Sequence, residues 1–402
     1  KKHRIVKERE QEENKMLQGK TVLLGVTGGI AAYKMPNVAR MLKKMHCNVH
    51  VLMTQNATNF ITATTFETLT GNKCLIDTFD RNFEFSVEHV ALAKQADLVL
   101  LAPATANVIG KIANGIADDM LTTTVMACTC KVLVAPAMNH NMYHNSIVQE
   151  NLEKLKRHGY EMIDPVCGML ANGDTGDGKL PSEETLVEYV LRELAFEKDM
   201  QGLKVLVTAG PTQEAIDPVR FISNHSTGKM GYAIAKNAML RGAEVTLVTG
   251  RTALEPPMFV KTVPVTSAKD MYQAVMECAK EQDIIVKAAA VADYTPAHTA
   301  DEKIKKSEGE LSLALEKTTD ILAELGKNKG NTVLCGFSME TEHMLENSRA
   351  KRKKKNLDMI AANNLKQQGA GFAGDTNVLT LITEDWEKEL ALMSKDEAAK
   401  CL

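Results

Sequence analysis

Short apolar runs alternate with amphipathic stretches along the first half of the chain. The runs at 21–26, 49–53, 96–101 and 131–134 have the length and the β-branched content of buried strands. Residues 30–45 lie between the first two runs and have helical spacing. This succession of strand, turn, helix and strand predicts a parallel sheet covered by helices.

The same pattern returns in the second half of the chain. Apolar runs at 205–208, 245–249 and 284–287 predict strands, and residues 272–281 predict a helix between the last two of them. We therefore expect two α/β domains, each built on a doubly wound, mainly parallel sheet.

Composition indicates where these domains begin and end. Residues 1–16 are charged and lack a core-facing period, so we expect a disordered leader, with Met16 as the natural initiator. The polar, glycine-ended segment 197–202 has the composition of a linker. The expected domains are therefore 17–196 and 203–402.

Composition and charge narrow the class of function. The chain has 402 residues, 44% of them apolar, and a formal net charge of −3. No apolar run approaches the roughly 18 residues of a membrane span, and the eight cysteines are scattered. The basic run 348–355 has no interleaved aromatic residues. We expect a cytoplasmic protein that binds neither a membrane nor nucleic acid.

A double glycine, Gly28–Gly29, directly follows the first predicted strand, so backbone N–H groups there can approach a phosphate. The G-x-G-x-x-G fingerprint is missing, and no acidic residue ends the second strand to bind a ribose. That strand ends instead in Met53, Thr54, Gln55 and Asn56. Neutral hydroxyl and amide groups favour a flavin mononucleotide over a nicotinamide dinucleotide.

The third and fourth strands both end in Ala-Pro-Ala and are followed by polar residues. Because the carboxyl ends of parallel strands line the ligand crevice, Thr105, Asn107 and Asn139 are expected to converge there. The alternative is that each proline merely ends its strand.

The second half carries its own candidate chemistry. Residues 223–229 supply hydroxyls, an amide and a lysine before an amphipathic segment, 230–241, which is the chemistry of an anion cradle at a helix N-terminus. The P-loop spacing is absent, and a loop that merely caps a helix is an equally good interpretation. Small residues after Lys287 permit close approach of a nucleotide, and Asp293 is placed to orient a ribose or a metal-bound phosphate.

Residues 25–34, 89–107 and 135–143 together resemble the flavin-dependent cysteine decarboxylases, and residues 205–355 resemble phosphopantothenate–cysteine ligase. The fused order resembles the bifunctional coenzyme A biosynthesis family of bacteria over nearly all of the chain after residue 16. The resemblance implies a flavoprotein domain followed by a Rossmann-like ligase domain. It also implies trimers through the first domain and dimers through the second.

For the first domain, the resemblance implies FMN-dependent decarboxylation of phosphopantothenoylcysteine to 4'-phosphopantetheine. His89 is then the catalytic histidine, acting across a subunit boundary, and Asn139 binds the substrate carboxylate. The implied flavin contacts are Gly28, Gly29, Ile30, Thr54, Ala104, Thr105, Ala106, Asn107 and Ala137.

For the second domain, the resemblance implies condensation of 4'-phosphopantothenate with L-cysteine through an acyl-cytidylate made from CTP with Mg²⁺. Asn224 then holds the carbonyl of that intermediate, and Lys303 neutralises phosphate charge, whereas Lys305 and Lys306 are ordinary surface lysines. The implied nucleotide contacts are Ala288, Ala289, Asp293, Lys303, Asp320, Ile321, Phe337, Lys351 and Lys355. The ligands of the metal stay open.

One residue departs from the family. Decarboxylases of this kind carry a cysteine in a flap over the substrate, and here Asn172 stands in its place. Met169, Leu170 and Ala171 still offer backbone groups to clamp the substrate. A carboxamide is a far weaker acid than a thiol, so the final proton transfer is expected to be slow. The alternative function is an active ligase whose FMN domain is impaired in turnover and serves regulation or assembly.

Overall fold

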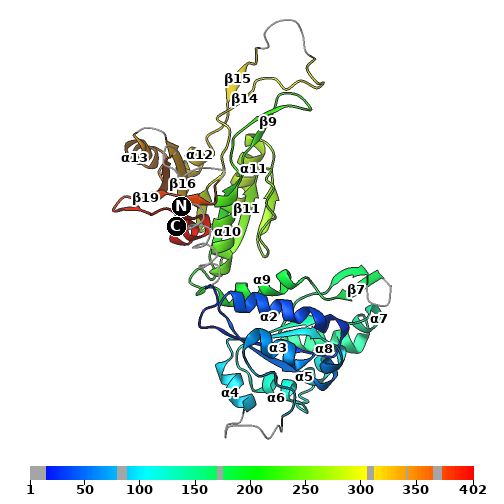
Figure 1. Ribbon diagram of the computed structural model, residues 1–402. Coiled ribbons are helices and arrows are strands. Elements are labelled where there is room, and N and C mark those ends of the chain that lie inside the picture. The colour runs from blue at the N-terminus through cyan, green and yellow to red at the C-terminus, as the bar shows by residue number, and fades with distance from the viewer. Residues whose placement is uncertain (1–14, 79–87, 170–174, 306–311, 341–342, 365–373) are drawn as a thin grey trace. The chain divides into compact units, whose positions relative to one another are not determined.

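The computed structural model describes residues 15–78, 88–169, 175–305, 312–340, 343–364 and 374–402 (Figure 1). The chain forms two compact units that divide between Phe196 and Glu197. None of the helices in these described ranges is both long and apolar enough to cross a bilayer.

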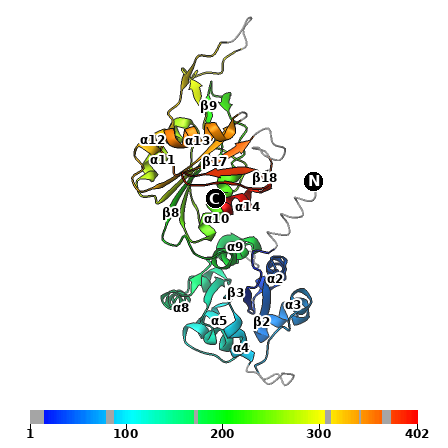
Figure 2. The same cartoon turned by 90° about the vertical axis from the view of Figure 1, so that its left-hand side faces the viewer.

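The first unit is organised around a five-stranded sheet with the order β2-β1-β3-β4-β5, in which every pairing is parallel. Every residue of β3 is buried, because helices cover both faces of the sheet. Figure 2 shows α2 and α3 on one side of the strands and α5 and α8 on the other. The strands are β1 (Thr21–Val26), β2 (Asn48–Met53), β3 (Leu98–Ala104), β4 (Lys131–Pro136) and β5 (Glu161–Met162).

Helices and one hairpin complete this unit. The antiparallel hairpin is formed by β6 (Val166–Met169) and β7 (Thr175–Lys179). The helices are η1 (Ile30–Lys34), α2 (Met35–Lys44), η2 (Gln55–Asn59), α3 (Ala63–Thr70), α4 (Glu88–Gln95), α5 (Ala106–Ala113), α6 (Met120–Ala127), α7 (His140–Tyr143), α8 (Ser146–Arg157) and α9 (Glu183–Leu194).

The first predicted helix is divided in the structure. A single helix was expected over 30–45, but a 3₁₀ turn, η1, precedes the α-helix α2. Pro36 lies in the first turn of α2, where its missing N–H costs nothing, and it cannot donate a hydrogen bond to the turn before it. The expectation of one continuous helix is therefore wrong at this point.

The second unit contains an eight-stranded sheet with the order β12-β11-β8-β13-β16-β17-β19-β20. The strands from β12 to β17 pair in parallel, whereas β19 and β20 are antiparallel additions at one edge. The strands are β8 (Lys204–Ala209), β11 (Glu244–Thr249), β12 (Lys261–Pro264), β13 (Ile284–Lys287), β16 (Val333–Glu340), β17 (Met359–Asn364), β19 (Leu379–Ile382) and β20 (Glu387–Glu389).

Short antiparallel ribbons and five helices surround this sheet in the described ranges. The ribbons pair β9 (Gln213–Ala215) with β10 (Phe221–Ser223), β14 (Tyr294–Pro296) with β15 (Leu315–Lys317), and β18 (Thr376–Asn377) with β21 (Met393–Ser394). The helices are α10 (Lys229–Leu240), α11 (Ala268–Ala279), α12 (Ile321–Lys327), α13 (Met344–Lys354) and α14 (Lys395–Cys401).

A glycine sets the approach of helix α10 to strand β8. A Cβ atom on Gly231 would lie 2.5 Å from the Cβ of Ala209 and 2.9 Å from the carbonyl oxygen of Thr208. Only glycine lets the first turn of α10 rest on the carboxyl end of β8 without displacing the backbone. The predicted pair of α/β domains with mainly parallel sheets is confirmed, and the N-terminus of α10 is held at the edge where a ligand would bind.

Candidate functional sites

Three helices of the first unit begin directly at the carboxyl edge of the sheet, and their N-termini carry no side-chain cap. The N-cap residues Gly29 of η1, Thr54 of η2 and Thr105 of α5 make no capping hydrogen bond. Helices α6 and α9, by contrast, are capped by Asp119 and Ser182. Uncapped N–H groups at the point where the order of the strands reverses form a binding site for an anionic ligand.

Buried hydrogen bonds align the elements of this edge. The hydroxyl of Thr27 donates to the carbonyl of Pro103 at 2.6 Å and accepts from the N–H of Thr105 at 3.0 Å. The N–H of Ala137 donates to the carbonyl of Ala104 at 3.0 Å. These bonds join the ends of β1, β3 and β4, so three of the predicted flavin contacts lie together.

The same edge has chemistry that suits a flavin mononucleotide. A Cβ on Gly28 would lie 2.5 Å from the Cβ of Asn56, so only glycine allows this close turn. The buried hydroxyl oxygen of Thr54 has no hydrogen-bond partner among the described residues. The side chain of Ile30, the first residue of η1, is 56% exposed. Uncapped N–H groups, an unpaired hydroxyl and an exposed apolar side chain fit a phosphate and a flat ring.

Two remaining predicted flavin contacts are the first two residues of helix α5. Ala106 is its first residue and is half-buried, and Asn107 follows in the same turn and is exposed. Both therefore lie at the uncapped N-terminus described above.

The predicted substrate and catalytic residues of this unit lie on separate elements. Asn139 caps helix α7 by accepting a hydrogen bond from the N–H of Asn141 at 2.9 Å. His89 lies half-buried in the first turn of α4, which packs against α6. Met169 ends strand β6 and is exposed. Three more predicted residues lie outside the described ranges, namely Leu170, Ala171 and Asn172.

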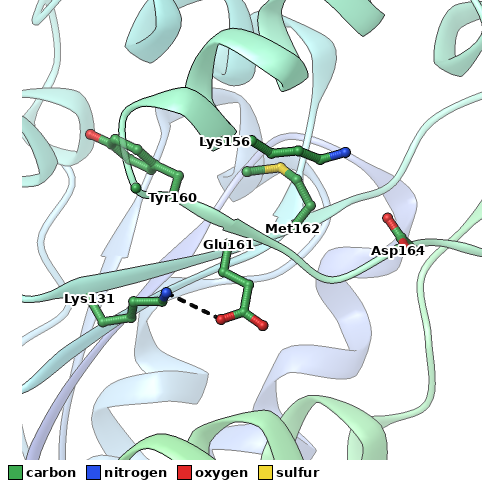
Figure 3. Close-up of a pocket in the computed structure, with 7 residues that line it drawn as sticks. Lys131, Lys156, Tyr160, Glu161, Met162 and Asp164 are labelled. Atoms are coloured by element: carbon green, nitrogen blue, oxygen red, sulfur yellow. Dashed lines mark ion pairs between the residues drawn. The ribbon is translucent and has the colours of Figure 1, made fainter. Parts of the chain in front are cut away.

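A cavity of about 380 Å³ beside β5 is not a candidate for either function (Figure 3). None of the residues predicted to bind flavin or substrate lines it. Two of its charged side chains bind each other: Lys131 pairs with Glu161 at 3.3 Å. Glu161 also accepts from Arg192, which lies outside the lining, at 2.5 Å.

A cavity of about 410 Å³ in the second unit gathers five of the predicted ligase residues. It lies where β13 and β16 end and α10 begins. Its lining includes Asn224, Ala288, Ala289, Asp293 and Phe337. Residues that are far apart in sequence therefore meet at the carboxyl edge of the sheet, as expected for an open α/β fold.

Hydrogen bonds fix the backbone that forms the floor of this cavity. The hydroxyl of Thr208 accepts from the N–H of Ala289 at 3.1 Å. The side-chain amide of Asn224 donates to the carbonyl of Ala290 at 2.9 Å. The N-cap of helix α10 is Gly228, whose φ is 79° and which makes no side-chain cap. An uncapped helix N-terminus therefore lies at this cavity as well.

Charged groups surround the same cavity. Lys287 lines it, and burial lowers the pKa of this lysine to about 8, with the positive charge of Lys355 acting in the same direction. The carboxylates of Asp320 and Asp293 oppose that shift. Lys355 pairs with Asp320 at 2.8 Å. Asp320 and Lys355 do not line the cavity, but their charges act on Lys287, which does.

Two further predicted nucleotide residues lie on neighbouring elements. Ile321 is the buried first residue of α12, directly after the N-cap Asp320. Lys351 lies on α13 and pairs with Glu340 at 2.7 Å. Neither lines the cavity in this chain.

Four polar or charged lining residues were not predicted from the sequence: Lys287, Asn363, Asn377 and Lys395. The buried side-chain oxygen of Asn363 has no hydrogen-bond partner within the described part of the chain, so it is available to a ligand. Burial lowers the pKa of Lys395 to about 8, and Lys229 adds to this effect. Lys287 directly precedes the predicted small-residue segment, whereas nothing near the C-terminus indicated Lys395.

Lys303 lies outside the cavity lining, on a segment that a buried carboxylate holds. The N–H of the next residue, Ile304, donates to Asp217 at 3.1 Å, and Arg220 donates to the carbonyl of Ile304 at 2.7 Å. Asp217 is only 2% exposed. Burial opposes its ionisation, but hydrogen bonds from Arg220 and from the N–H groups of Val219, Arg220 and Ile304 outweigh burial and keep the pKa well below its usual range.

Comparison with known proteins identifies the class. Residues 10–195 match the family described as Flavoprotein. Residues 200–402 match the DNA/pantothenate metabolism flavoprotein C-terminal domain. The fold and its two sites therefore define a flavoprotein fused to a second α/β domain.

Relatives that match this chain over nearly its whole length identify the family more closely. The chain is 46% identical over 384 residues to the coenzyme A biosynthesis bifunctional protein CoaBC of Bacillus subtilis (strain 168), covering 94% of this chain and 95% of that protein. It is 43% identical over 384 residues to the protein of the same name from Escherichia coli (strain K12), with 94% and 95% covered. A crystal structure of the C-terminal domain of such a protein is 44% identical, covers 50% of this chain and 92% of that one, and has a TM-score of 0.44.

The chain belongs to the family of bifunctional coenzyme A biosynthesis proteins. It is a two-activity enzyme, a phosphopantothenate–cysteine ligase joined to a phosphopantothenoylcysteine decarboxylase.

The hydrogen bond from the N–H of Ile304 to Asp217 leads to a testable prediction. In Asp217→Asn, a charge-assisted hydrogen bond to Ile304 becomes a neutral one, so amide exchange at Ile304 should accelerate about tenfold or more. Hydrogen-exchange mass spectrometry of a peptide covering 301–305 measures this rate. Asp199→Asn is the matched control, because Asp199 also binds an arginine, Arg241, but on the surface. Equal exchange rates in the two variants would rule out the positioning role of Asp217.

Proposed function

We propose that the second unit joins 4'-phosphopantothenate to L-cysteine with CTP and Mg²⁺, and that the first unit decarboxylates the product to 4'-phosphopantetheine with FMN. The observation that carries this proposal is the pair of carboxyl sheet edges at which helix N-termini lack side-chain caps. Each edge offers backbone N–H groups to a phosphate, and both proposed ligands, FMN and CTP, carry phosphate.

In the ligase unit, positive charge and small side chains are combined as nucleotide binding requires. Lys287 and Lys395 line the cavity beside the N-terminus of α10 and would neutralise the triphosphate. Ala288 and Ala289 leave room for the nucleotide, and Phe337 offers a face for the base. The preference for CTP over other nucleotides rests on the family resemblance.

The chemistry of this unit has two steps. The carboxylate of 4'-phosphopantothenate attacks the α-phosphorus of CTP, which forms the acyl-cytidylate and releases pyrophosphate. The amine of cysteine then attacks the acyl carbon, which forms the amide, and CMP leaves. Asn224 would hold the acyl carbonyl, and Asp293 would face the metal-bound phosphates, because both side chains line the cavity. Lys303 would stabilise charge on the transferred phosphate.

In the first unit, the residues around the strand ends would hold the cofactor. The uncapped first turns that follow Gly29, Thr54 and Thr105 would present N–H groups to the phosphate of FMN, and Ile30 would contact its ring. Bound FMN supplies the oxidation that makes loss of the carboxylate possible. Asn139 would bind that carboxylate from its position beside Ala137.

Catalysis in the first unit also requires a proton acceptor. A histidine accepts a proton readily near neutral pH, so His89 would take the thiol proton. His89 and Asn139 lie on different helices, α4 and α7. The family resemblance implies that His89 serves the site of a neighbouring subunit in a trimer, with ligase units pairing as dimers. The eight cysteines are all free thiols, which accords with a reducing, cytoplasmic setting.

A second candidate function remains for the first unit. Asn172 replaces the cysteine that relatives of this kind use, and it lies outside the described ranges. On this alternative the unit binds FMN and assembles the enzyme without completing turnover.

The ligase proposal predicts the behaviour of a lysine variant. Lys303→Ala should lower the rate of CMP release by about 10²–10³, because charge stabilisation of the transferred phosphate is lost. Steady-state CMP release, measured with saturating substrates, gives this rate. Lys305→Ala is the matched control, since Lys305 is an exposed lysine on the same segment. CMP release at the parental rate in Lys303→Ala would refute the role.

The departure at position 172 predicts a gain of function. The unmodified enzyme should release carbon dioxide but form 4'-phosphopantetheine slowly, and Asn172→Cys should accelerate that last step because a thiol is a competent acid. Product formation and carbon dioxide release, followed in parallel, separate the two stages. Rapid and complete turnover by the unmodified protein, insensitive to Cys167→Ala, would show that another group donates the proton.

A further inference from the structure

Two histidines and a carboxylate gather on the first unit, and neither proposed activity uses these three side chains. His140 is the first residue of helix α7, and His144 is its C-terminal cap. Asp177 lies on strand β7, which packs beside α7 (Figure 1). One ligand atom from each of the three side chains lies within 4.8 Å of the other two. Two histidines four residues apart project from the same side of a helical turn.

The separations within this group match those of a coordination shell. The Nε2 atom of His144 lies 3.1 Å from the Oδ2 atom of Asp177. Zinc bonds of about 2.0–2.1 Å in tetrahedral geometry place ligand atoms about 3.3 Å apart. These two atoms therefore already have the required spacing. The ligand atom of His140 lies within 4.8 Å of the other two, so this side chain must move closer to reach the same spacing.

The backbone around the group is held in place before any ion binds. The N–H of Met138 donates to the carbonyl of Gly178 at 3.0 Å, which fixes β7 against the segment that enters α7. The N–H of Asp177 donates to the Nδ1 atom of His140 at 3.2 Å. A Cβ on Gly176 would lie 2.8 Å from the ring of His140, so the glycine makes room for that ring. The ligands are thus presented by two elements that are already joined.

We propose that His140, His144 and Asp177 bind one divalent transition-metal ion of the zinc class. Imidazole nitrogen and carboxylate oxygen together suit Zn²⁺, whereas Mg²⁺ prefers oxygen ligands alone. The side chains of His144 and Asp177 are 48% and 44% exposed, so water completes the coordination. On binding, the ion replaces two hydrogen bonds, the one between His144 and the Asp177 carboxylate and the one that the Nδ1 atom of His140 accepts from the N–H of Asp177. Any proton on the Nε2 atom of His144 passes to solvent.

The ion would tie strand β7 to helix α7 and so restrain a segment that the decarboxylase is proposed to use. Asn139, the proposed carboxylate ligand, directly precedes His140 and caps the same helix. The site is separate from the Mg²⁺ that accompanies CTP, because it lies in the other unit.

Isothermal titration of ZnCl₂ into the full-length, tag-free protein tests this site. We expect one site per chain that weakens at least tenfold in His144→Ala and in Asp177→Asn. His158→Ala is the matched control, because His158 is exposed in the same unit and lies outside the group. Zinc should also raise the melting temperature of the parent and of His158→Ala, but not that of the other two variants.

Circular dichroism and the absorbance of bound flavin show that each variant is folded. Asp177→Asn keeps an amide oxygen able to accept from His144, so it preserves the hydrogen bond and removes only the ligand charge. Zinc that other groups bind, such as exposed cysteines, stays the same in all four proteins. Equal zinc affinity and stoichiometry in the parent, His144→Ala and Asp177→Asn would overturn the proposal.

Discussion

Helices that begin directly at the carboxyl ends of parallel strands leave backbone N–H groups without partners, and both units are built around such ends. Four N–H groups at each helix N-terminus need a hydrogen-bond acceptor, and a buried one that lacks it costs about 1–3 kcal/mol. Gly29, Thr54 and Thr105 in the first unit and Gly228 in the second supply no side-chain cap. An anionic ligand would satisfy these groups, as proposed above for FMN at one edge and CTP at the other.

Buried polar side chains elsewhere hold these edges in shape. Thr27 joins the ends of β1 and β3, and Thr208 fixes the segment that follows β13. Asp217 holds Ile304, and thereby the backbone next to Lys303, from a position that water does not reach. Each of these groups acts on a ligand only through the backbone it positions. The chemistry at both edges therefore depends on residues that touch no substrate.

The sequence predicted the fold well where burial is continuous and less well where local effects decide. Buried parallel strands read as unbroken apolar runs, so the predicted run 21–26 coincides with β1 and 284–287 with β13. The helix expected over 30–45 divides before Pro36. The antiparallel strands β19 and β20 are short, with four and three residues, and neither was predicted.

The residues of the candidate sites were likewise predicted only in part. The residues that follow strands, such as Ala288 and Asp293, were found because strand ends converge. Asn363 and Lys395 reach the same cavity from the late strand β17 and from the last helix, α14, and only the tertiary structure places them there. Residues at 170–172 lie outside the described ranges, so their predicted role in clamping the substrate stays a prediction.

The central claim is that one chain carries both activities and uses them in succession. Purified protein given 4'-phosphopantothenate, CTP, Mg²⁺ and cysteine labelled in its carboxyl carbon tests this claim in one vessel. The account predicts CMP and labelled carbon dioxide, with no labelled gas when either CTP or 4'-phosphopantothenate is omitted. CMP without labelled carbon dioxide, or labelled carbon dioxide that does not require CTP, would contradict it.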